Sequence, residues 1–164
     1  MIIVGIDPGL SGAIAILKDI KVLNIFDMPV MADGKKNKRQ LNSAQLVNII
    51  RENTKSSEEI IVVVEQVNAM PGQGVTSMFN FGQTFGAIKG VCAALQLPIF
   101  FVRPSKWKKH FQLIKASKDS SRTKTIEMYP HLSNQLSKKK DVNKSDAILI
   151  ARYYSETNPR DNHV

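Results

Sequence analysis

The chain has 164 residues, 43% of them hydrophobic and 23% charged, which is typical of one soluble domain (1–164) with its own core. A formal charge of +9 and a pI near 9.7 favour a polyanionic partner. No stretch approaches the roughly 18 apolar residues of a membrane span, and the lone Cys92 excludes a disulfide framework or a paired-cysteine zinc site and favours a core position.

Three apolar runs joined by short turns open the chain and predict an antiparallel meander. They cover residues 2–7, 13–17 and 20–28. The first run ends in a carboxylate and has no basic leader before it, so it predicts a buried strand and not a secretory signal. A polar, basic loop containing a glycine is expected over 29–40.

A helix is expected next, from Ser43 to Asn53, with Ser43 as its cap. Its apolar residues Leu46, Ile49 and Ile50 fall on one face, as the helical period requires. The β-branched run 60–65 then predicts a central strand buried on both faces, and this strand also ends in an acid.

A glycine-containing loop over 66–77 leads into a long helix that is expected to end near Leu95. Gly82, Gly86 and Gly90 recur every four residues along this helix, so one stripe has almost no side chains. Each glycine costs about 1 kcal/mol in a helix interior. The stripe therefore indicates a close approach to the helix backbone, either by the protein's own sheet or by the same helix of a second copy.

A fifth strand is expected over 98–102, followed by helices over 104–111, 117–129 and 142–155. The order βββαβαβααα predicts one α/β domain. We expect a mixed five-stranded sheet, with three antiparallel and then two parallel strands, and helices on both of its faces.

Three acids lie where such a fold gathers a site. Asp7 ends the first strand, Glu65 ends the strand over 60–65, and Asp146 lies in the first turn of the last helix. Close carboxylates repel one another, and a divalent cation removes the conflict. Carboxylate oxygens suit Mg²⁺, and two ions about 4 Å apart would stabilise the attacking and leaving oxygens of a phosphodiester. The acids could equally be unrelated, since Asp146 also suits a helix N-terminus.

Positive charge is concentrated in two segments. Residues 103–144 hold twelve Lys or Arg side chains and three acids, and Lys35, Lys36, Lys38 and Arg39 crowd one loop. Both segments fit a solvated basic surface or a nucleic-acid contact. A nuclear-localisation signal in KKNKR is a further, unspecific possibility.

Five motifs, taken together, resemble RuvC-type Holliday junction resolvases of the RNase H-like nuclease superfamily. They are GIDPGLSGA (5–13), VVVEQV (62–67), FGQTFGAIKG (81–90), VRPSKWKK (102–109) and NKSDAILIARY (143–153). They span nearly the whole chain in the family's order. Lys118, twelve residues before Pro130, is similar to a lysine of phage-type members.

The resemblance implies an RNase H-like fold and a structure-specific endonuclease that nicks four-way DNA junctions symmetrically as a homodimer. It implies Asp7, Glu65 and Asp146 as ligands of Mg²⁺, for which Mn²⁺ would substitute, and it puts Lys108 and Lys118 near the scissile phosphates. It also implies no membrane partner, and action in the cytoplasm of a bacterium or of a phage-infected host.

Two positions depart from the family pattern. The fourth site residue, three positions before the final acid, is Asn143 where the family has Asp or His. Its amide oxygen is a weaker ligand, and Asp141 becomes a candidate if the helix begins later. In the loop after Glu65, where many members carry an aromatic wedge, we expect Met70 to serve. For Phe79 and Phe81, core packing is favoured for at least one.

The expected DNA contacts come from the basic segment and the loop after Glu65. They are Lys106, Lys108, Lys109, Lys115, Lys118, Arg122 and Met70. Three alternatives remain at this point: an RNase H-like nuclease acting on flaps, Y-junctions or RNA–DNA hybrids; a sugar-kinase or actin-type ATP-binding module, which would need a second phosphate loop; and a DNA-binding module without catalysis.

Overall fold

The computed structural model describes residues 1–55 and 59–158, and its main sheet has five strands in the order β3-β2-β1-β6-β7. The strands are β1 (Ile2–Asp7), β2 (Ala13–Lys18), β3 (Lys21–Asp27), β6 (Ile60–Glu65) and β7 (Ile99–Val102). Strands β3, β2 and β1 pair antiparallel, whereas β1, β6 and β7 pair parallel. The predicted mixed five-stranded sheet is confirmed.

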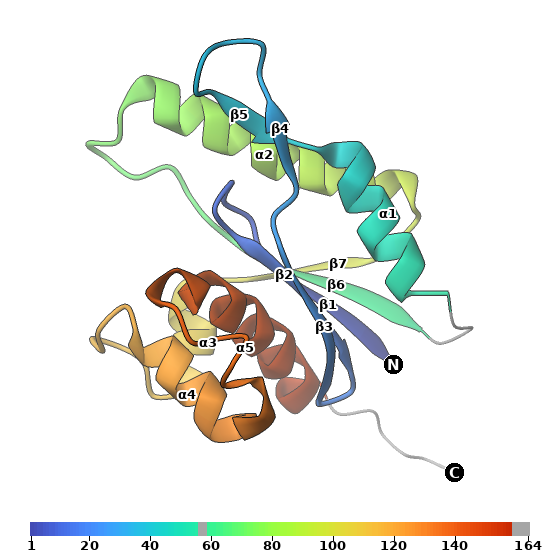
Figure 1. Ribbon diagram of the computed structural model, residues 1–164, viewed down its shortest axis with the longest axis vertical. Coiled ribbons are helices and arrows are strands. Elements are labelled where there is room, and N and C mark those ends of the chain that lie inside the picture. Colours follow the sequence, from blue (N-terminus) through green and yellow to red (C-terminus); the bar gives the residue numbers. More distant parts are fainter. Residues whose placement is uncertain (56–58, 159–164) are drawn as a thin grey trace.

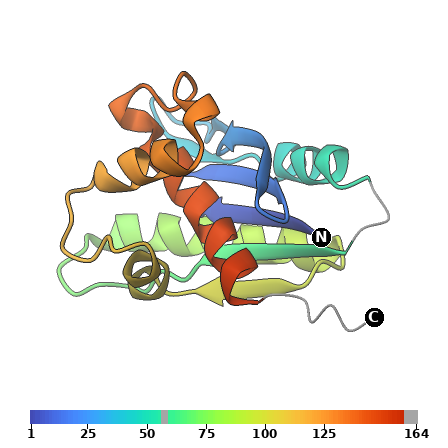
Figure 2. The same ribbon diagram turned by 90° about the horizontal axis from the view of Figure 1, so that it is seen from below.

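Helices cover both faces of this sheet, as predicted (Figures 1 and 2). One face carries α1 (Ser43–Asn53) and α2 (Val75–Ala94), and the other carries α3 (Pro104–His110), α4 (Ser120–Met128) and α5 (Val142–Thr157). Two short 3-10 turns, Pro130–Leu132 and Lys139–Asp141, lie between α4 and α5. Among the described residues, no helix combines the length and the apolar character that crossing a bilayer would need.

Alternation along β1 and β6 decides which side chains face which helix layer. Ile2, Val4 and Ile6 pack in the core beneath α1 and α2, whereas Ile3 packs in the core beneath α5. Because successive side chains of a strand point to opposite faces, Asp7 lies on the same face as Ile3. The same alternation on β6 puts Glu65 on the α5 face together with Val63.

Helix α5 lies unusually close to β1, and Gly5 makes this possible. A Cβ atom at Gly5 would lie 2.3 Å from the carbonyl oxygen of Ala147 and 2.8 Å from the Cβ of Ala151. Both atoms belong to the middle of α5, so any side chain at position 5 would push the helix away from the sheet. The first glycine of the GIDPG motif therefore sets the distance between α5 and the end of β1.

The prediction of a loop over 29–40 was wrong, because this segment contributes to a second, two-stranded sheet. Strands β4 (Val30–Ala32) and β5 (Arg39–Leu41) pair antiparallel, with Val30 opposite Leu41. Each strand has only three residues, so no alternation long enough to predict a strand is present in the sequence. Leu41 is buried, and it anchors the hairpin in the core beneath α1 and α2.

The cap of α1 was also assigned wrongly, and the burial of β6 is less complete than predicted. Asn42, not Ser43, is the N-cap, because its side-chain oxygen accepts a hydrogen bond from the backbone N–H of Gln45 at 3.0 Å. Ile60 and Ile61 are only partly buried, since the strand begins at the rim of the sheet. The predicted core position of Cys92 and the buried face of α1 are confirmed.

The glycine stripe of α2 faces away from the rest of the chain. Apart from its chain neighbours and the nearby backbone of α2 itself, a Cβ atom added at Gly82, Gly86 or Gly90 would meet no described atom within 4 Å. Of the two interpretations of the stripe, packing against the protein's own sheet is therefore wrong.

Replacing Gly5→Ala should lower the free energy of unfolding by roughly 1–3 kcal/mol, because the added methyl group collides with the backbone of α5. Gly9→Ala, in the same motif, is the matched control, since its Cβ would meet its nearest atom at an ordinary 3.7 Å. Urea denaturation followed by circular dichroism measures both. Equal stability of the two variants would contradict the close packing of α5 on β1.

Candidate active site

Two of the predicted site acids end neighbouring parallel strands. Ile6 of β1 pairs with Val64 of β6, so the residues that follow, Asp7 and Glu65, leave the sheet side by side at one edge. Both lie on the face covered by α5. Asp146 is the fifth residue of α5, so it lies one residue beyond the first turn in which it was predicted. The close contact at Gly5 holds α5 against β1.

The three carboxyl groups interact with one another. Burial raises the pKa of Asp7 to about 7, and the negative charges of Glu65 and Asp146 contribute to this rise. Burial, with a smaller contribution from Glu65, raises the pKa of Asp146 to about 6. The pKa of Glu65 is also raised, chiefly by burial. Three acids from distant parts of the chain therefore share one poorly solvated space in which full ionisation is costly.

Nearby hydrogen-bond donors and cationic side chains offset only part of the cost of ionising these acids. The indole Nε1 of Trp107 donates a hydrogen bond of 2.8 Å to Oε1 of Glu65, and the backbone N–H of Gly9 lowers the pKa of Asp7. The ammonium groups of Lys108 and Lys118 both favour the charged form of Asp146.

One oxygen of the site has no partner. Oδ1 of Asp146 is buried without a hydrogen bond. The hydroxyl of Ser121 lies near this carboxyl and lowers its pKa, but it forms no hydrogen bond of normal geometry. A buried acceptor without a donor is costly, and a cation would satisfy it.

Residues 1–55 and 59–158 contain no group of three His, Cys, Asp or Glu side chains already gathered as ligands of one ion. The donor set nevertheless fits a hard divalent cation, because it consists of carboxylate oxygens, one of them unsatisfied.

Asn143 and Asp141 have different surroundings. Nδ2 of Asn143 donates a hydrogen bond of 2.5 Å to the carbonyl of Ser11, which ties the start of α5 to the turn after β1 and leaves the amide oxygen for a ligand role. Asp141 is the N-cap of α5. Its carboxylate accepts from the N–H of Lys138 and forms an ion pair with Lys144 at 3.2 Å, and its charge is not among those that shift the pKa of Asp7 or Asp146.

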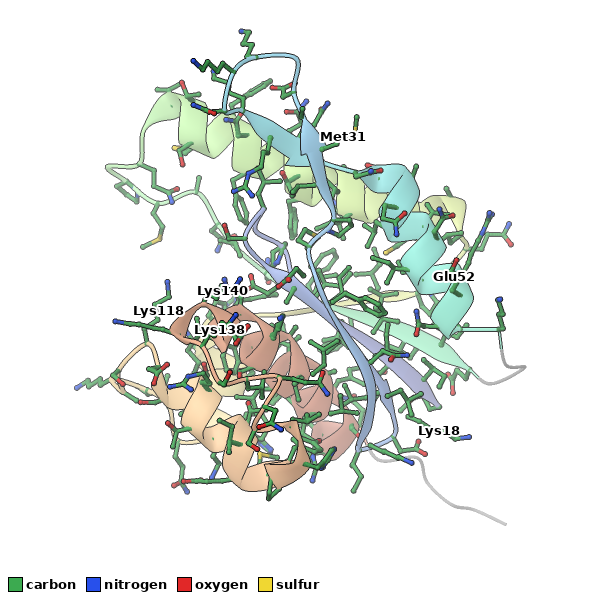
Figure 3. All side chains as sticks on the ribbon, in the orientation of Figure 1. Lys18, Met31, Glu52, Lys118, Lys138 and Lys140 are labelled. Carbon is green, nitrogen blue, oxygen red and sulfur yellow. The ribbon has the colours of Figure 1, made fainter. Side chains whose placement is uncertain are left out.

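Two basic cavities lie beside the acids. Lys108 and Lys118 line a cavity of about 350 Å³ together with Trp107 and Asp146. Lys118 also borders a neighbouring cavity of about 340 Å³, whose other cationic residues are Lys139 and Lys140 and which includes Asn143. Lys118, Lys138 and Lys140, which lie on the segments before α4 and α5, are grouped on one side of the molecule (Figure 3).

Among the other predicted DNA contacts, Lys106, Lys109 and Lys115 are exposed. Arg122 differs, because its guanidinium makes two hydrogen bonds to the carboxylate of Asp119 and a third, of 3.0 Å, to the carbonyl of Leu136. Arg122 thus links α4 to the segment that precedes α5.

Trp107 is a site residue that sequence reasoning missed. Its side chain is fully buried, and its N–H finds Glu65 as acceptor. The signal was present in the sequence, because a single tryptophan in an otherwise basic helical segment is a large core residue whose N–H needs an acceptor when buried.

The loop after Glu65 and the start of α2 expose apolar side chains. Met70 is 61% exposed and Phe79 is 70% exposed. Phe81 is partly buried and lines an apolar cavity of about 220 Å³ together with Val67 and Met78. Among the described residues Phe81 belongs to neither hydrophobic core and Phe79 is exposed, so the expectation that at least one of the two packs in the core was wrong.

Comparison with solved structures identifies the fold. The chain is similar to RuvC of T. thermophilus in complex with a Holliday junction substrate, with a TM-score of 0.60 and 16% identity over 96% of each chain. It is also similar to another Thermus thermophilus RuvC structure (TM-score 0.53, 17% identity, 96% of each chain). The yeast mitochondrial Holliday junction resolvase matches with a TM-score of 0.53 and 16% identity, over 93% of this chain and 77% of that one.

No protein-family model matches the sequence, and no curated protein matches it. At these identities the structural likeness establishes the fold. The chain has the RNase H-like fold of RuvC, and the fold class implied by the motif resemblance is confirmed.

In the metal-free protein, the raised pKa values make stability fall as the pH rises. Asp7 and Asp146 are neutral in the folded protein below their pKa values of about 7 and about 6, whereas in the unfolded chain they ionise near 3.8. Their contribution is therefore most favourable below about pH 4 and is lost as the pH rises through 6 and 7.

Asp146→Asn removes one of these charges. In EDTA at pH 8 the variant should be more stable than the wild type by on the order of 1–3 kcal/mol, and near pH 4 the two should be similar. Urea denaturation at both pH values tests this, with addition of Mg²⁺ expected to stabilise the wild type more than the variant at pH 8. A pH-independent difference would argue against a strained, buried carboxylate.

Proposed function

We propose that this chain is a metal-dependent crossover junction endodeoxyribonuclease, which resolves four-way DNA junctions by hydrolysing phosphodiester bonds. The observation that carries the proposal is that Glu65 and Asp146 lie close enough to the buried carboxyl group of Asp7 to raise its pKa, while Lys108 and Lys118 line one cavity with Asp146. The shared fold supports it, because one structure of that fold is RuvC bound to a Holliday junction substrate.

In this proposal Asp7, Glu65 and Asp146 would hold Mg²⁺, or Mn²⁺ in its place, and the amide oxygen of Asn143 would assist. The bound metal supplies Lewis-acid polarisation of the phosphate and an activated water. Trp107 orients one oxygen of Glu65 by its hydrogen bond and leaves the other oxygen to bind. The link from Asn143 to Ser11 keeps Asp146 beside the turn that follows Asp7.

Lys108 and Lys118 would bind the scissile phosphate and stabilise the negative charge that builds up on it. Both lie in the cavity that contains Asp146. Lys106, Lys109 and Lys115 are exposed nearby and would follow the neighbouring phosphates without reading bases. Because Arg122 is engaged with Asp119, we assign it the role of holding this surface in place instead of a free phosphate contact.

A homodimer would bring two such sites to one junction. The open glycine stripe of α2 supports this assembly, since a helix surface without side chains lets a second helix approach closely. Exposed Phe79 and Val75 extend the same helix surface toward its N-terminus and would add apolar contact.

Met70 would act as an apolar wedge at the branch point. It is 61% exposed on the loop that connects Glu65 to α2. This short loop keeps it near the catalytic edge, by which we mean the ends of β1 and β6 that carry Asp7 and Glu65. An apolar side chain there can separate stacked bases. The enzyme would act in the cytoplasm of a bacterium or of a phage-infected host.

Purified protein with Mg²⁺ should introduce paired, symmetric nicks near the centre of a synthetic four-way junction. Asp7→Asn should lower the cleavage rate at least about 100-fold, because it removes a metal ligand, while junction binding persists. The matched control is Glu52→Gln, an exposed acid on α1 far from the site, which should cut normally. Denaturing gels of end-labelled strands give the rates.

The proposed homodimer is tested with a supercoiled plasmid that extrudes a cruciform. A dimer that makes both cuts during one encounter gives linear plasmid, whereas independent cuts give nicked circles. Normal cleavage by Asp7→Asn would overturn the site assignment. Faster cleavage of flaps, Y-junctions or RNA–DNA hybrids than of four-way junctions would replace the proposed substrate.

A further inference from the structure

The β4–β5 hairpin carries a second concentration of positive charge, separate from the active-site lysines. Four of the seven residues from 33 to 39 are cations, namely Lys35, Lys36, Lys38 and Arg39, and Asp33 is the only acid among them. All four cationic side chains are exposed. None of them forms an ion pair with an acid in the described part of the chain.

Hydrogen bonds within the hairpin fix the backbone that carries these four cationic residues. Within the tip, the N–H of Asp33 donates to the carbonyl of Lys38 at 3.0 Å, and the N–H of Lys38 donates to the carbonyl of Lys35 at 3.1 Å. Gly34 and Asn37 take the left-handed conformation, with φ of 63° at each, which a tight turn requires. Like charges held this close repel one another, and the tip buries no apolar group in compensation.

A polar cleft lies between this hairpin and α2. It has a volume of about 220 Å³, and its lining includes Leu10, Asp33, Arg39, Gln40, Asn80 and Gln83. Leu10 follows Asp7 by three residues, so one end of the cleft lies at the turn after β1. Arg39 lies at the hairpin end, and the amides of the lining residues offer further donors.

The hairpin and the active-site lysines lie on opposite sides of the main sheet. Figure 3 shows Met31 of β4 on one side, and Lys118, Lys138 and Lys140 on the other. In Figure 1 the hairpin projects beyond α2, away from α3, α4 and α5. The catalytic edge is therefore flanked by two basic surfaces.

We propose that the hairpin tip is a second DNA-backbone-binding element, which holds a duplex arm of the branched substrate while the strand to be cut occupies the catalytic edge. The identity of the substrate rests on the function proposed above. The side chains of the tip suit phosphate groups, because several of them are flexible cations. The tip has none of the aromatic residues that anchor protein–protein interfaces. Duplex DNA presents one charge per about 1.7 Å of its axis, so a short cluster of cations meets several phosphates.

The test compares two variants that each remove three positive charges. The hairpin variant is Lys35→Ala, Lys36→Ala and Lys38→Ala. The matched control is Lys21→Ala, Arg51→Ala and Lys55→Ala, whose parent residues are exposed at the start of β3 and the end of α1. Binding to four-way junctions with long and with truncated arms is measured over a range of salt concentrations, in EDTA so that no strand is cut.

For long-armed junctions the hairpin variant should bind at least about tenfold more weakly than the control. Its slope of log Kd against log salt should be smaller by about 0.9 for each phosphate that the hairpin no longer neutralises. With truncated arms the difference should disappear, because the hairpin would have no DNA to reach. Equal affinity and slope of the two variants on long arms would overturn the proposal.

The outcomes separate this proposal from the proposed function. If the wild type cuts junctions and the two variants bind alike, only the hairpin assignment fails. If the hairpin variant binds duplex arms more weakly but the wild type cuts no junction, the hairpin remains a DNA-binding element and the proposed nuclease function fails. A wild type that binds no DNA overturns both.

Discussion

The candidate site depends on three buried carboxyl groups, those of Asp7, Glu65 and Asp146, whose negative charges disfavour one another. Asp7 and Glu65 leave neighbouring parallel strands at the same edge, and Asp146 comes from the helix that covers this edge. Burial and mutual repulsion raise the pKa of Asp7 to about 7. Such an arrangement lowers the stability of the metal-free protein at neutral pH, and buried carboxylates of this kind are typical of functional sites.

Several features of the fold maintain this proximity. Gly5 lets α5 lie against β1, the hydrogen bond from Asn143 to Ser11 ties the start of α5 to the turn after β1, and Trp107 fixes one oxygen of Glu65. Each contact joins segments that are far apart in the sequence. Two basic surfaces, one with Lys118 and one on the β4–β5 hairpin, lie on opposite sides of the main sheet.

Much of this arrangement was predictable from the sequence, for identifiable reasons. The apolar runs predict β1, β2 and β6. The acids that end β1 and β6 predict that Asp7 and Glu65 meet if the two strands are neighbours, and the structure pairs these strands directly. The β4–β5 hairpin was missed because three-residue strands show no period. The role of Trp107 was missed because a lone tryptophan signals that its buried N–H needs an acceptor but does not identify Glu65, which lies 42 positions away in the sequence. The cap of α1 was placed at Ser43 because Ser and Asn cap equally well, and only the backbone path decides between adjacent candidates.

Direct measurement of metal binding tests the central claim. Mn²⁺ titrated into the wild type at pH 7.5 and followed by calorimetry or electron paramagnetic resonance should show saturable binding. Asp146→Asn should weaken this binding at least about tenfold, and the exposed-acid variant Glu52→Gln should leave it unchanged. Equal Mn²⁺ affinity in the wild type and Asp146→Asn, or no saturable binding in the wild type, would show that the three acids do not form a metal site.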